Sequence, residues 1–240
     1  MGNNTRYSIV DSLRGLAVSL MIVFHFCYDL TYFNYYTFDF YNDPFWLNFR
    51  SLIVSLFLLI AGVSLILVHK HANSKKKIIR RIIILSACSL LITTVSYFLF
   101  PGRTITFGII HFITVASLLS LPFTRWPTLC GVLGVTLIYI GTNISHTFFD
   151  QAAYHWIGLM THRPSTEDYV PLLPWLGVVL CGISIGSLLD NTPRGRIILN
   201  LHIDIRGVSV LTWLGTHSLA AYMLHQAILF SLFWLYTTLF

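Results

Sequence analysis

The stretch FRSLIVSLFLLIAGVSLILV, residues Phe49 to Val68, contains a single charged side chain, Arg50. A helix of about 20 residues, rising 1.5 Å per residue, crosses the ~30 Å hydrocarbon core of a bilayer. The whole chain has the same character, because 55% of its 240 residues are hydrophobic and only 10% are charged. So few charged residues cannot cover a water-soluble globule. The sequence therefore predicts an integral membrane protein.

Six further apolar runs, about 17 to 23 residues long, are separated by loop-forming residues such as Asn42-Asp43-Pro44. The alternating segments of about 10 residues that mark an outer-membrane barrel are absent along most of the chain. We therefore predict an all-α transmembrane helix bundle of about seven spans, forming a single domain over residues 1–240. The predicted spans are Ile9–Tyr28, Phe49–Val68, Ile78–Phe100, Ile105–Leu121, Thr128–Ile144, Val170–Leu189 and Ser218–Tyr236.

Lys and Arg are distributed unevenly over the loops between these spans. Positively charged loops resist translocation, so the side that carries them is expected to be cytoplasmic. With a cytoplasmic N-terminus, 12 of the 15 basic residues lie inside and only Arg50, Arg103 and Arg163 lie outside. We predict N-terminus in and C-terminus out. This distribution also explains the formal charge of +6, so membrane lipid is the expected partner and a nucleic acid is not needed.

The segment from Ile198 to Arg206 does not fit this pattern, because its apolar and polar residues alternate with a period of two. We interpret it as a segment at the cytoplasmic interface. The alternative is an extra, broken span, which would move the C-terminus inside.

The cysteines and the first apolar run bear on processing. All four cysteines lie within apolar runs and show no metal-ligand spacing, so we expect neither a disulfide nor a zinc site. The first run carries Arg14 and His25 and is not followed by a small-residue cleavage site, so we expect it to remain as the first span. The cysteines are Cys27, Cys88, Cys130 and Cys181.

Every ionisable group of the first span lies on one stripe. At 100° per residue, Asp11, Arg14, His25 and Asp29 fall within about 60° of one another. Charges in hydrocarbon are expensive, so this stripe is expected to face the protein interior, a partner charge or water. For Asp11 and Arg14, the alternative is a simple i,i+3 pair at the cytoplasmic interface.

His25 and Asp29 are one helical turn apart in the outer part of the predicted span. A carboxylate at this spacing can accept a hydrogen bond from one ring nitrogen, fix the tautomer and leave the other nitrogen to take a proton. We therefore predict a catalytic pair, with His25 as the base and Asp29 as the group that orients it.

Further candidates lie in the later spans. We consider His111, Tyr222 and His225 as residues lining a substrate cavity together with Asp11, the alternative being an interhelical hydrogen-bond network. Trp175 suits either an interfacial anchor or the wall of an outward-facing cavity. The small residues of the second and sixth spans are interpreted as packing positions. They are Ser51, Ser55, Gly62, Gly182 and Gly186.

The motif Asp11-Ser12-Leu13-Arg14-Gly15-Leu16-Ala17, with His25 ten residues after Gly15, resembles the opening of polytopic membrane acyltransferases. More narrowly, the chain is similar to the bacterial branch, of unassigned function, of the family that contains lysosomal heparan-alpha-glucosaminide N-acetyltransferase. The similar motifs extend over nearly the whole chain. They include Leu56 to Ser64, Gly108 to Phe112, Pro171 to Gly177 and Ser218 to His225.

The resemblance implies transfer of an acyl group, expected to be acetyl, from cytosolic acyl-CoA to a hydroxyl or amine acceptor outside the bacterial inner membrane. The acceptor would be a small molecule, a sugar or a glycan, and no metal would take part. His25 would act as general base or carry the acyl group briefly. Arg14, Lys77 and Arg81 would bind the CoA phosphates at the cytoplasmic end.

One motif of the family differs. The eukaryotic members that acetylate glucosamine carry a His-x-x-Trp motif just before the second span, whereas this chain has Tyr41-Asn42-Asp43-Pro44-Phe45-Trp46 there. His25, in the first span, is the histidine placed to replace it.

Two other classes of function are left open. A proton-coupled transporter or flippase would use His25, Asp29 and His111 as a proton relay. A non-catalytic membrane subunit would pack against a partner, which could be a second copy in a homodimer, through its Gly and Ser faces.

Overall fold

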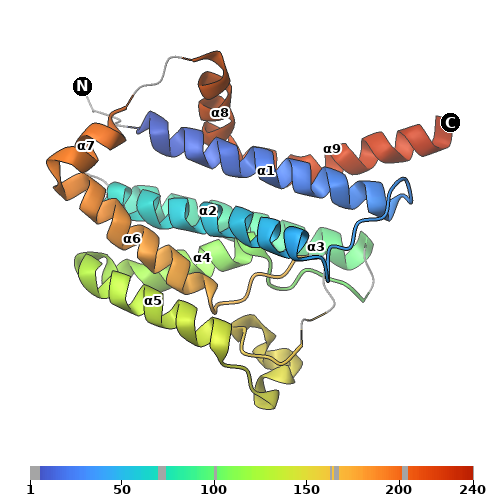
Figure 1. Ribbon diagram of the computed structural model, residues 1–240, viewed down its shortest axis with the longest axis horizontal. Coiled ribbons are helices and arrows are strands. Elements are labelled where there is room, and N and C mark those ends of the chain that lie inside the picture. The colour runs from blue at the N-terminus through green and yellow to red at the C-terminus, as the bar shows by residue number, and fades with distance from the viewer. Residues whose placement is uncertain are drawn as a thin grey trace. The chain divides into compact units, whose positions relative to one another are not determined.

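The computed structural model describes residues 6–69, 74–99, 102–162, 164, 168–201 and 205–239, so the predicted outside position of Arg163 lies beyond the described residues. Within these ranges the chain is helical and contains no strand (Figure 1). The α-helices are α1 (Ser8–Tyr32), α2 (Pro44–His69), α3 (Ser74–Leu99), α4 (Ile109–Ser120), α5 (Pro127–Asn143), α6 (Trp175–Asn191), α7 (Pro193–Leu199), α8 (Arg206–Thr216) and α9 (Ser218–Leu239). The 3-10 helices are η1 (Leu121–Arg125), η2 (Thr147–Asp150) and η3 (Ala152–Ile157).

The seven predicted spans all coincide with helices, which confirms the all-α class. Among the described residues, α1, α2, α3 and α9 are long and apolar enough to cross a membrane, and α6 with α7 forms a fifth, bent candidate. The 12 residues of α4 and the 17 of α5 are shorter than the ~20 residues that a straight span needs. The count of seven spans therefore stays a prediction.

α2 and α3 begin about one turn before the spans predicted within them, whereas two other predicted spans begin about one turn before their helices do. The helix expected from Ile105 begins at Ile109, where the carboxylate of Asp168 accepts a hydrogen bond from the Ile109 backbone N–H at 2.9 Å. The helix expected from Val170 begins at Trp175, because Leu172 donates its backbone N–H to a carbonyl of η3 at 2.7 Å. In both cases a partner distant in sequence determines where the helix starts.

The segment after α6 contains two short helices. α7 is bent by 105° from α6, and α8 has 11 residues, a length of about 16 Å that cannot cross a bilayer alone. The period-two pattern did not predict either helix, although Ile198 and Leu199 complete α7 and Arg206 begins α8. Residues 202–204 lie outside the described residues.

The chain divides into two compact units. The first combines Met1–Phe57 with Pro193–Phe240, and the second is Leu58–Thr192. The single domain over residues 1–240 stays a prediction. The core of the first unit is built around Val18, Met21 and Ile53, which pack against partly buried side chains of α1, α2, α8 and α9.

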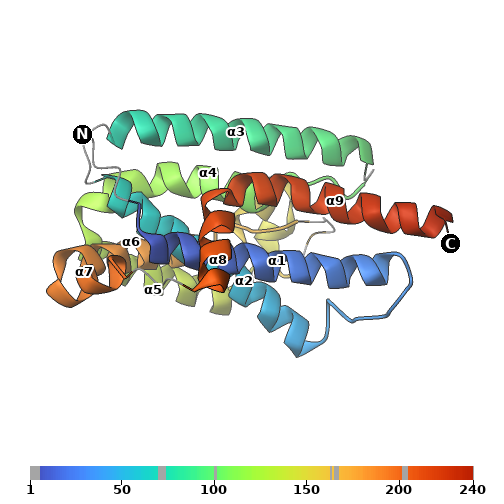
Figure 2. The same ribbon diagram turned by 90° about the horizontal axis from the view of Figure 1, so that it is seen from above.

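Helix α9 lies beside α1 in the first unit (Figure 2). Contacts between them advance in the same direction along both segments, so the two helices run parallel. The contacting pairs are His25 with His225, Asp29 with Gln226, and Phe33 with Phe230.

Glycines let α8 cross α1 at very short range. A Cβ added at Gly15 would overlap the carbonyl oxygen of Leu211, and one added at Gly215 would overlap the carbonyl oxygen of Asp11. Beside this crossing, the hydroxyls of Ser12 and Thr212 lie 2.7 Å apart in a hydrogen bond. The Gly15 of the N-terminal motif is therefore required for packing between these two helices.

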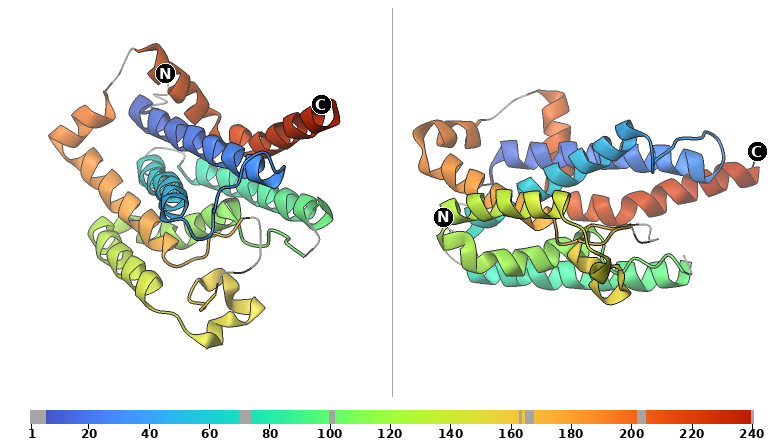
Figure 3. Two further views of the ribbon diagram at one scale, coloured as in Figure 1. Left: turned by 45° about the vertical axis from the view of Figure 1, so that its right-hand side comes forward. Right: turned by 60° about the horizontal axis from the view of Figure 1, so that its bottom comes forward.

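In the second unit, α5 and α6 lie side by side (Figure 3) and run antiparallel, since Gly134 contacts Gly177 and Gly141 contacts Pro174. Small residues also bring the second half of α2 against α6. A Cβ at Gly182 would overlap the carbonyl oxygen of Leu59. The predicted packing role of Gly182 is confirmed. Gly62 and Gly186 pack across the same contact.

The connection from α5 to α6 is ordered by its own polar groups. Asp150 accepts hydrogen bonds from the backbone N–H and the hydroxyl of Thr161, both at 2.7 Å. These two donors lower the pKa of the Asp150 carboxyl. The Tyr169 hydroxyl donates to the carbonyl oxygen of His155 at 2.6 Å. These hydrogen bonds tie together the described residues of the connection, next to the start of α6.

Candidate functional site

Two histidines from opposite ends of the sequence meet where α9 packs along α1. The ring centroids of His25 and His225 are 4.8 Å apart, with an interplanar angle of 60°. The His25 ring also contacts Phe24 at 5.7 Å. His225 is buried and His25 is half-buried. The structure thus brings together two of the predicted site residues in the interior of the first unit.

The tautomer of His225 follows from its backbone partner. Its Nδ1 lies 2.6 Å from the carbonyl oxygen of Tyr222, and a carbonyl oxygen can only accept, so Nδ1 carries the hydrogen and donates it. A neutral His225 then presents its lone pair at Nε2. The Tyr222 and His225 rings also contact each other, with centroids 5.6 Å apart.

Asp29 has a different partner from the one predicted. Its Oδ1 accepts a hydrogen bond from Gln226 Nε2 at 2.8 Å, and its Oδ2 has no hydrogen-bond partner among the described residues. Neither oxygen therefore bonds the His25 ring, and the prediction that Asp29 orients His25 is wrong. The physical reason is that Asp29 lies on the turn that packs against α9, where the amide of Gln226 is the nearer donor.

Asp11 and Arg14 form an i,i+3 ion pair, as the alternative interpretation predicts. Arg14 Nη1 lies 2.7 Å from Asp11 Oδ1, and Arg6 Nε lies 3.3 Å from Asp11 Oδ2. Arg14 Nη1 also donates to the carbonyl oxygen of Gly215 at 3.4 Å. Asp11 is buried, so this network anchors the start of α1 to the end of α8.

His111 is bonded at both ring nitrogens. Its Nδ1 accepts the backbone N–H of Gly108 at 3.3 Å, so the hydrogen of a neutral ring lies on Nε2 and is donated to Thr93 Oγ1, 2.9 Å away. The Thr93 hydroxyl in turn donates to the carbonyl oxygen of Ile105 at 2.9 Å. This arrangement caps the start of α4 and joins it to α3. It is an interhelical hydrogen-bond network, the alternative to a cavity-lining role for His111.

The remaining predicted residues lie in the second unit. Lys77 and Arg81 occupy the first turns of α3, with Lys77 exposed and Arg81 half-buried. Trp175 is the half-buried first residue of α6. Since Arg14 belongs to the first unit, a common CoA site for Arg14, Lys77 and Arg81 stays a prediction.

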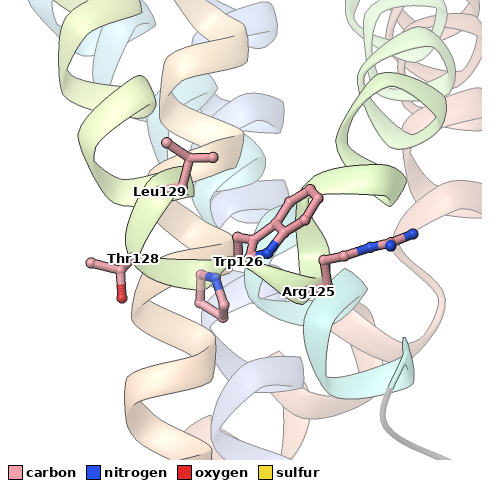
Figure 4. A pocket seen from close by; sticks show the side chains of 5 residues that line it. Arg125, Trp126, Thr128 and Leu129 are labelled. Carbon is pink, nitrogen blue, oxygen red and sulfur yellow. The ribbon is translucent and has the colours of Figure 1, made fainter.

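A shallow surface pocket lies at the junction of η1 and α5, with a volume of about 490 Å³. Arg125 stacks over the Trp126 ring there, 5.0 Å from its centroid. Figure 4 shows both side chains projecting from the turn, with Thr128 and Leu129 on the following helix. None of the predicted site residues lines this pocket.

Gln226 is the residue that the sequence analysis missed. Its position next to His225 on α9 could have indicated a site residue. Sequence reasoning selected ionisable residues in apolar runs, and an amide carries no charge. With it, the candidate site consists of groups from two parallel helices. We refer to this set as the α1–α9 site: His25, Asp29, Tyr222, His225 and Gln226.

The comparisons with known proteins agree with the resemblance of the motifs. The family model described as "Heparan-alpha-glucosaminide N-acetyltransferase, catalytic" matches residues 6–227, which include all the described helices up to the α1–α9 site. No curated protein and no solved structure matches the chain significantly. The match spans most of the chain, and the chain therefore belongs to the heparan-alpha-glucosaminide N-acetyltransferase catalytic-domain family.

Proposed function

We propose that this membrane protein transfers an acetyl group from cytosolic acetyl-CoA to a hydroxyl or amine acceptor on the outer side of the membrane. Membership of a membrane acyltransferase family supports the class of reaction. The observation that carries the assignment to a site is the contact between the His25 and His225 rings, 4.8 Å apart. Two imidazoles held in a protein interior provide the proton acceptor that acyl transfer needs near neutral pH.

In the proposed mechanism, His25 takes the proton of the acceptor hydroxyl or amine while the acceptor atom attacks the thioester carbonyl carbon. The carbon–sulfur bond then breaks, and the imidazolium of His25 returns the proton to the departing thiolate. His225, whose Nδ1–H is held by the Tyr222 carbonyl oxygen, supports the charged ring through its Nε2 lone pair. At most one of the two rings is an imidazolium at any time, because two adjacent positive charges would repel each other.

The basic residues at the start of α3 suit the phosphates of CoA. Lys75, Lys76, Lys77 and Arg80 are exposed, and Arg81 is half-buried, so binding a phosphate there costs little desolvation. Arg14 suits this task less well, because its guanidinium already bonds Asp11 at 2.7 Å. We therefore propose Lys77 and Arg81 as the phosphate-binding residues of this reaction.

The experiment uses the full chain purified in detergent, with acetyl-CoA labelled in the acetyl group. The proposal expects release of CoA that depends on an added acceptor, with glucosamine as the amine probe and glucose as the hydroxyl probe. Absence of CoA release with both probes, from a protein that elutes as one folded species, contradicts an acetyltransferase. Reconstituted vesicles that show His25-dependent solute flux without CoA would instead support the transporter hypothesis.

A further inference from the structure

In the α1–α9 site, Asp29 and Gln226 each have a buried hydrogen-bond acceptor without a partner among the described residues. Asp29 is 0% exposed, and it receives one hydrogen bond, from Gln226 Nε2 to Oδ1 at 2.8 Å. The other carboxylate oxygen, Asp29 Oδ2, and the amide oxygen, Gln226 Oε1, are both buried without a hydrogen-bond partner among the described residues. Both orphaned atoms belong to one bonded pair of side chains.

Such a pair is costly unless something donates to it. A buried acceptor that has lost water and gained no donor destabilises the fold, and an orphaned group in a native structure calls for an explanation. The cost is larger for a carboxylate in a membrane-spanning helix. The ion pair of Asp11 with Arg6 and Arg14 shows how this chain compensates a buried carboxylate elsewhere. For Asp29, the hydrogen-bond donor found among the described residues is the neutral amide of Gln226.

The position of the pair suggests what donates to it. Asp29 lies one turn after His25 on α1, a rise of about 6 Å, and Gln226 directly follows His225 on α9. A hydroxyl or amino group that bonds the pair therefore lies close to the two imidazoles. The imidazoles remove the proton of the reacting group during acyl transfer, so the group that bonds the pair is a neighbour of the reacting group on the same acceptor.

We propose that Asp29 Oδ2 and Gln226 Oε1 bind the acceptor substrate by accepting hydrogen bonds from hydroxyl or amino groups beside the one that reacts. This inference rests on the proposed function and assigns the acceptor subsite within it. The pair holds the acceptor so that its reacting group keeps its proton for His25 while a lone pair of the reacting oxygen or nitrogen points toward the thioester. Asp29 is thus a substrate-binding residue and not a group that orients His25.

The test compares Asp29→Asn and Gln226→Met with wild type in the CoA-release assay, with glucosamine and glucose as acceptors. Asp29→Asn keeps the shape of the side chain but replaces one acceptor atom by a donor. Gln226→Met keeps the volume and removes the amide. Ser19→Ala is the matched control on α1, because the Ser19 hydroxyl donates only to the Gly15 carbonyl of its own helix, at 3.0 Å.

KM for the acceptor is expected to rise about tenfold or more in Asp29→Asn, which loses a hydrogen bond to a charged group, and about threefold or more in Gln226→Met, which loses one to a neutral amide. KM for acetyl-CoA stays at the wild-type value, and Ser19→Ala matches wild type in both constants. Binding of glucosamine without acetyl-CoA, measured by isothermal titration, weakens by a similar factor in Asp29→Asn.

Two results separate the inference from the proposed function. If wild type transfers acetyl but Asp29→Asn keeps the wild-type KM for the acceptor, the Asp29 carboxyl does not bind the acceptor, and the subsite is overturned while the transferase stands. If wild type releases no CoA with either acceptor, the proposed function fails and the subsite fails with it.

Discussion

At the scale of single residues, the surroundings of His25 and His111 assign them different tasks. The ring of His25 contacts the rings of His225 and Phe24. Among the described residues, its nitrogens form no hydrogen bond to the backbone. His111 instead bonds Gly108 and Thr93 through its two ring nitrogens. One histidine is therefore suited to proton transfer and the other to holding the start of a helix.

Replacing His111 by Ala is expected to lower stability and spare catalysis. The backbone N–H of Gly108 and the hydroxyl of Thr93 lose a partner, which costs about 1–3 kcal/mol. A lower melting temperature with a near wild-type kcat is the expected result in detergent. A variant that melts like wild type but has lost acetyl transfer would return His111 to the reacting groups.

For Asp29, the sequence predicted burial but not the hydrogen-bond partner. Helical periodicity placed Asp29 and His25 on one stripe of α1, and both carboxylates of that stripe, Asp11 and Asp29, are buried. The pattern holds no information on which helix lies beside α1, so Gln226 could not be identified as the partner of Asp29. Contacts within a helix are predictable from spacing, whereas contacts between helices depend on packing.

At the scale of helices, the crossing of α1 and α8 depends on two glycines. Replacing Gly15 by Ala places a methyl group onto the Leu211 carbonyl, and replacing Gly215 by Ala places one onto the Asp11 carbonyl. Backbone atoms cannot move aside as a flexible side chain can, so either variant is expected to lose several kcal/mol of stability. Fluorescence-detected size-exclusion chromatography measures the resulting fall in folded yield.

Gly207→Ala is the matched control for this experiment, because a Cβ at Gly207 meets nothing within 4 Å. It lies on α8 itself and removes a glycine from a helix, so its yield should equal or slightly exceed that of wild type. Equal yields for Gly15→Ala and Gly207→Ala would contradict the close crossing.

The start of α4 offers a second test at this scale. Asp168 accepts the backbone N–H of Ile109 at 2.9 Å, which is the task of an N-cap although Asp168 lies 59 residues away in sequence. Asp168→Ala is expected to cost about 1 kcal/mol, seen as a lower melting temperature. Unchanged melting would mean that another group caps the helix.

Helices were easier to predict than their ends. Long apolar runs identify α1, α2, α3 and α9, because length and composition alone determine which segments can cross hydrocarbon. The starts of α4 and α6 depend on Asp168 and on η3, partners that no local pattern reveals. α8 was not predicted, because a helix of 11 residues is too short to give the long apolar run that identifies a span.

At the scale of the whole molecule, helix directions within each unit agree with an odd number of crossings. In the first unit α1 and α9 run parallel, as the first and seventh of seven alternating spans must. In the second unit α5 and α6 run antiparallel, as consecutive spans must. The placement of the two termini on opposite sides of the membrane stays a prediction.

Labelling of introduced cysteines tests this topology. Lys76→Cys and Gln151→Cys both lie at exposed positions, in the loops predicted to be inside and outside respectively. In a background with the four native cysteines replaced by Ala, a membrane-impermeant maleimide added to intact cells should label position 151 only. Labelling of position 76 but not 151 would reverse the orientation, and labelling of both would contradict an odd span number between them.

The central claim is that an imidazole in the α1–α9 site takes the proton of the acceptor during acetyl transfer. The most direct measurement is the initial rate of CoA release from acetyl-CoA with glucosamine, compared between wild type and His25→Gln at equal amounts of folded protein. The account predicts a fall of about 100-fold or more in kcat for His25→Gln, with Ser19→Ala at the wild-type rate. A His25→Gln protein that releases CoA as fast as wild type would contradict it.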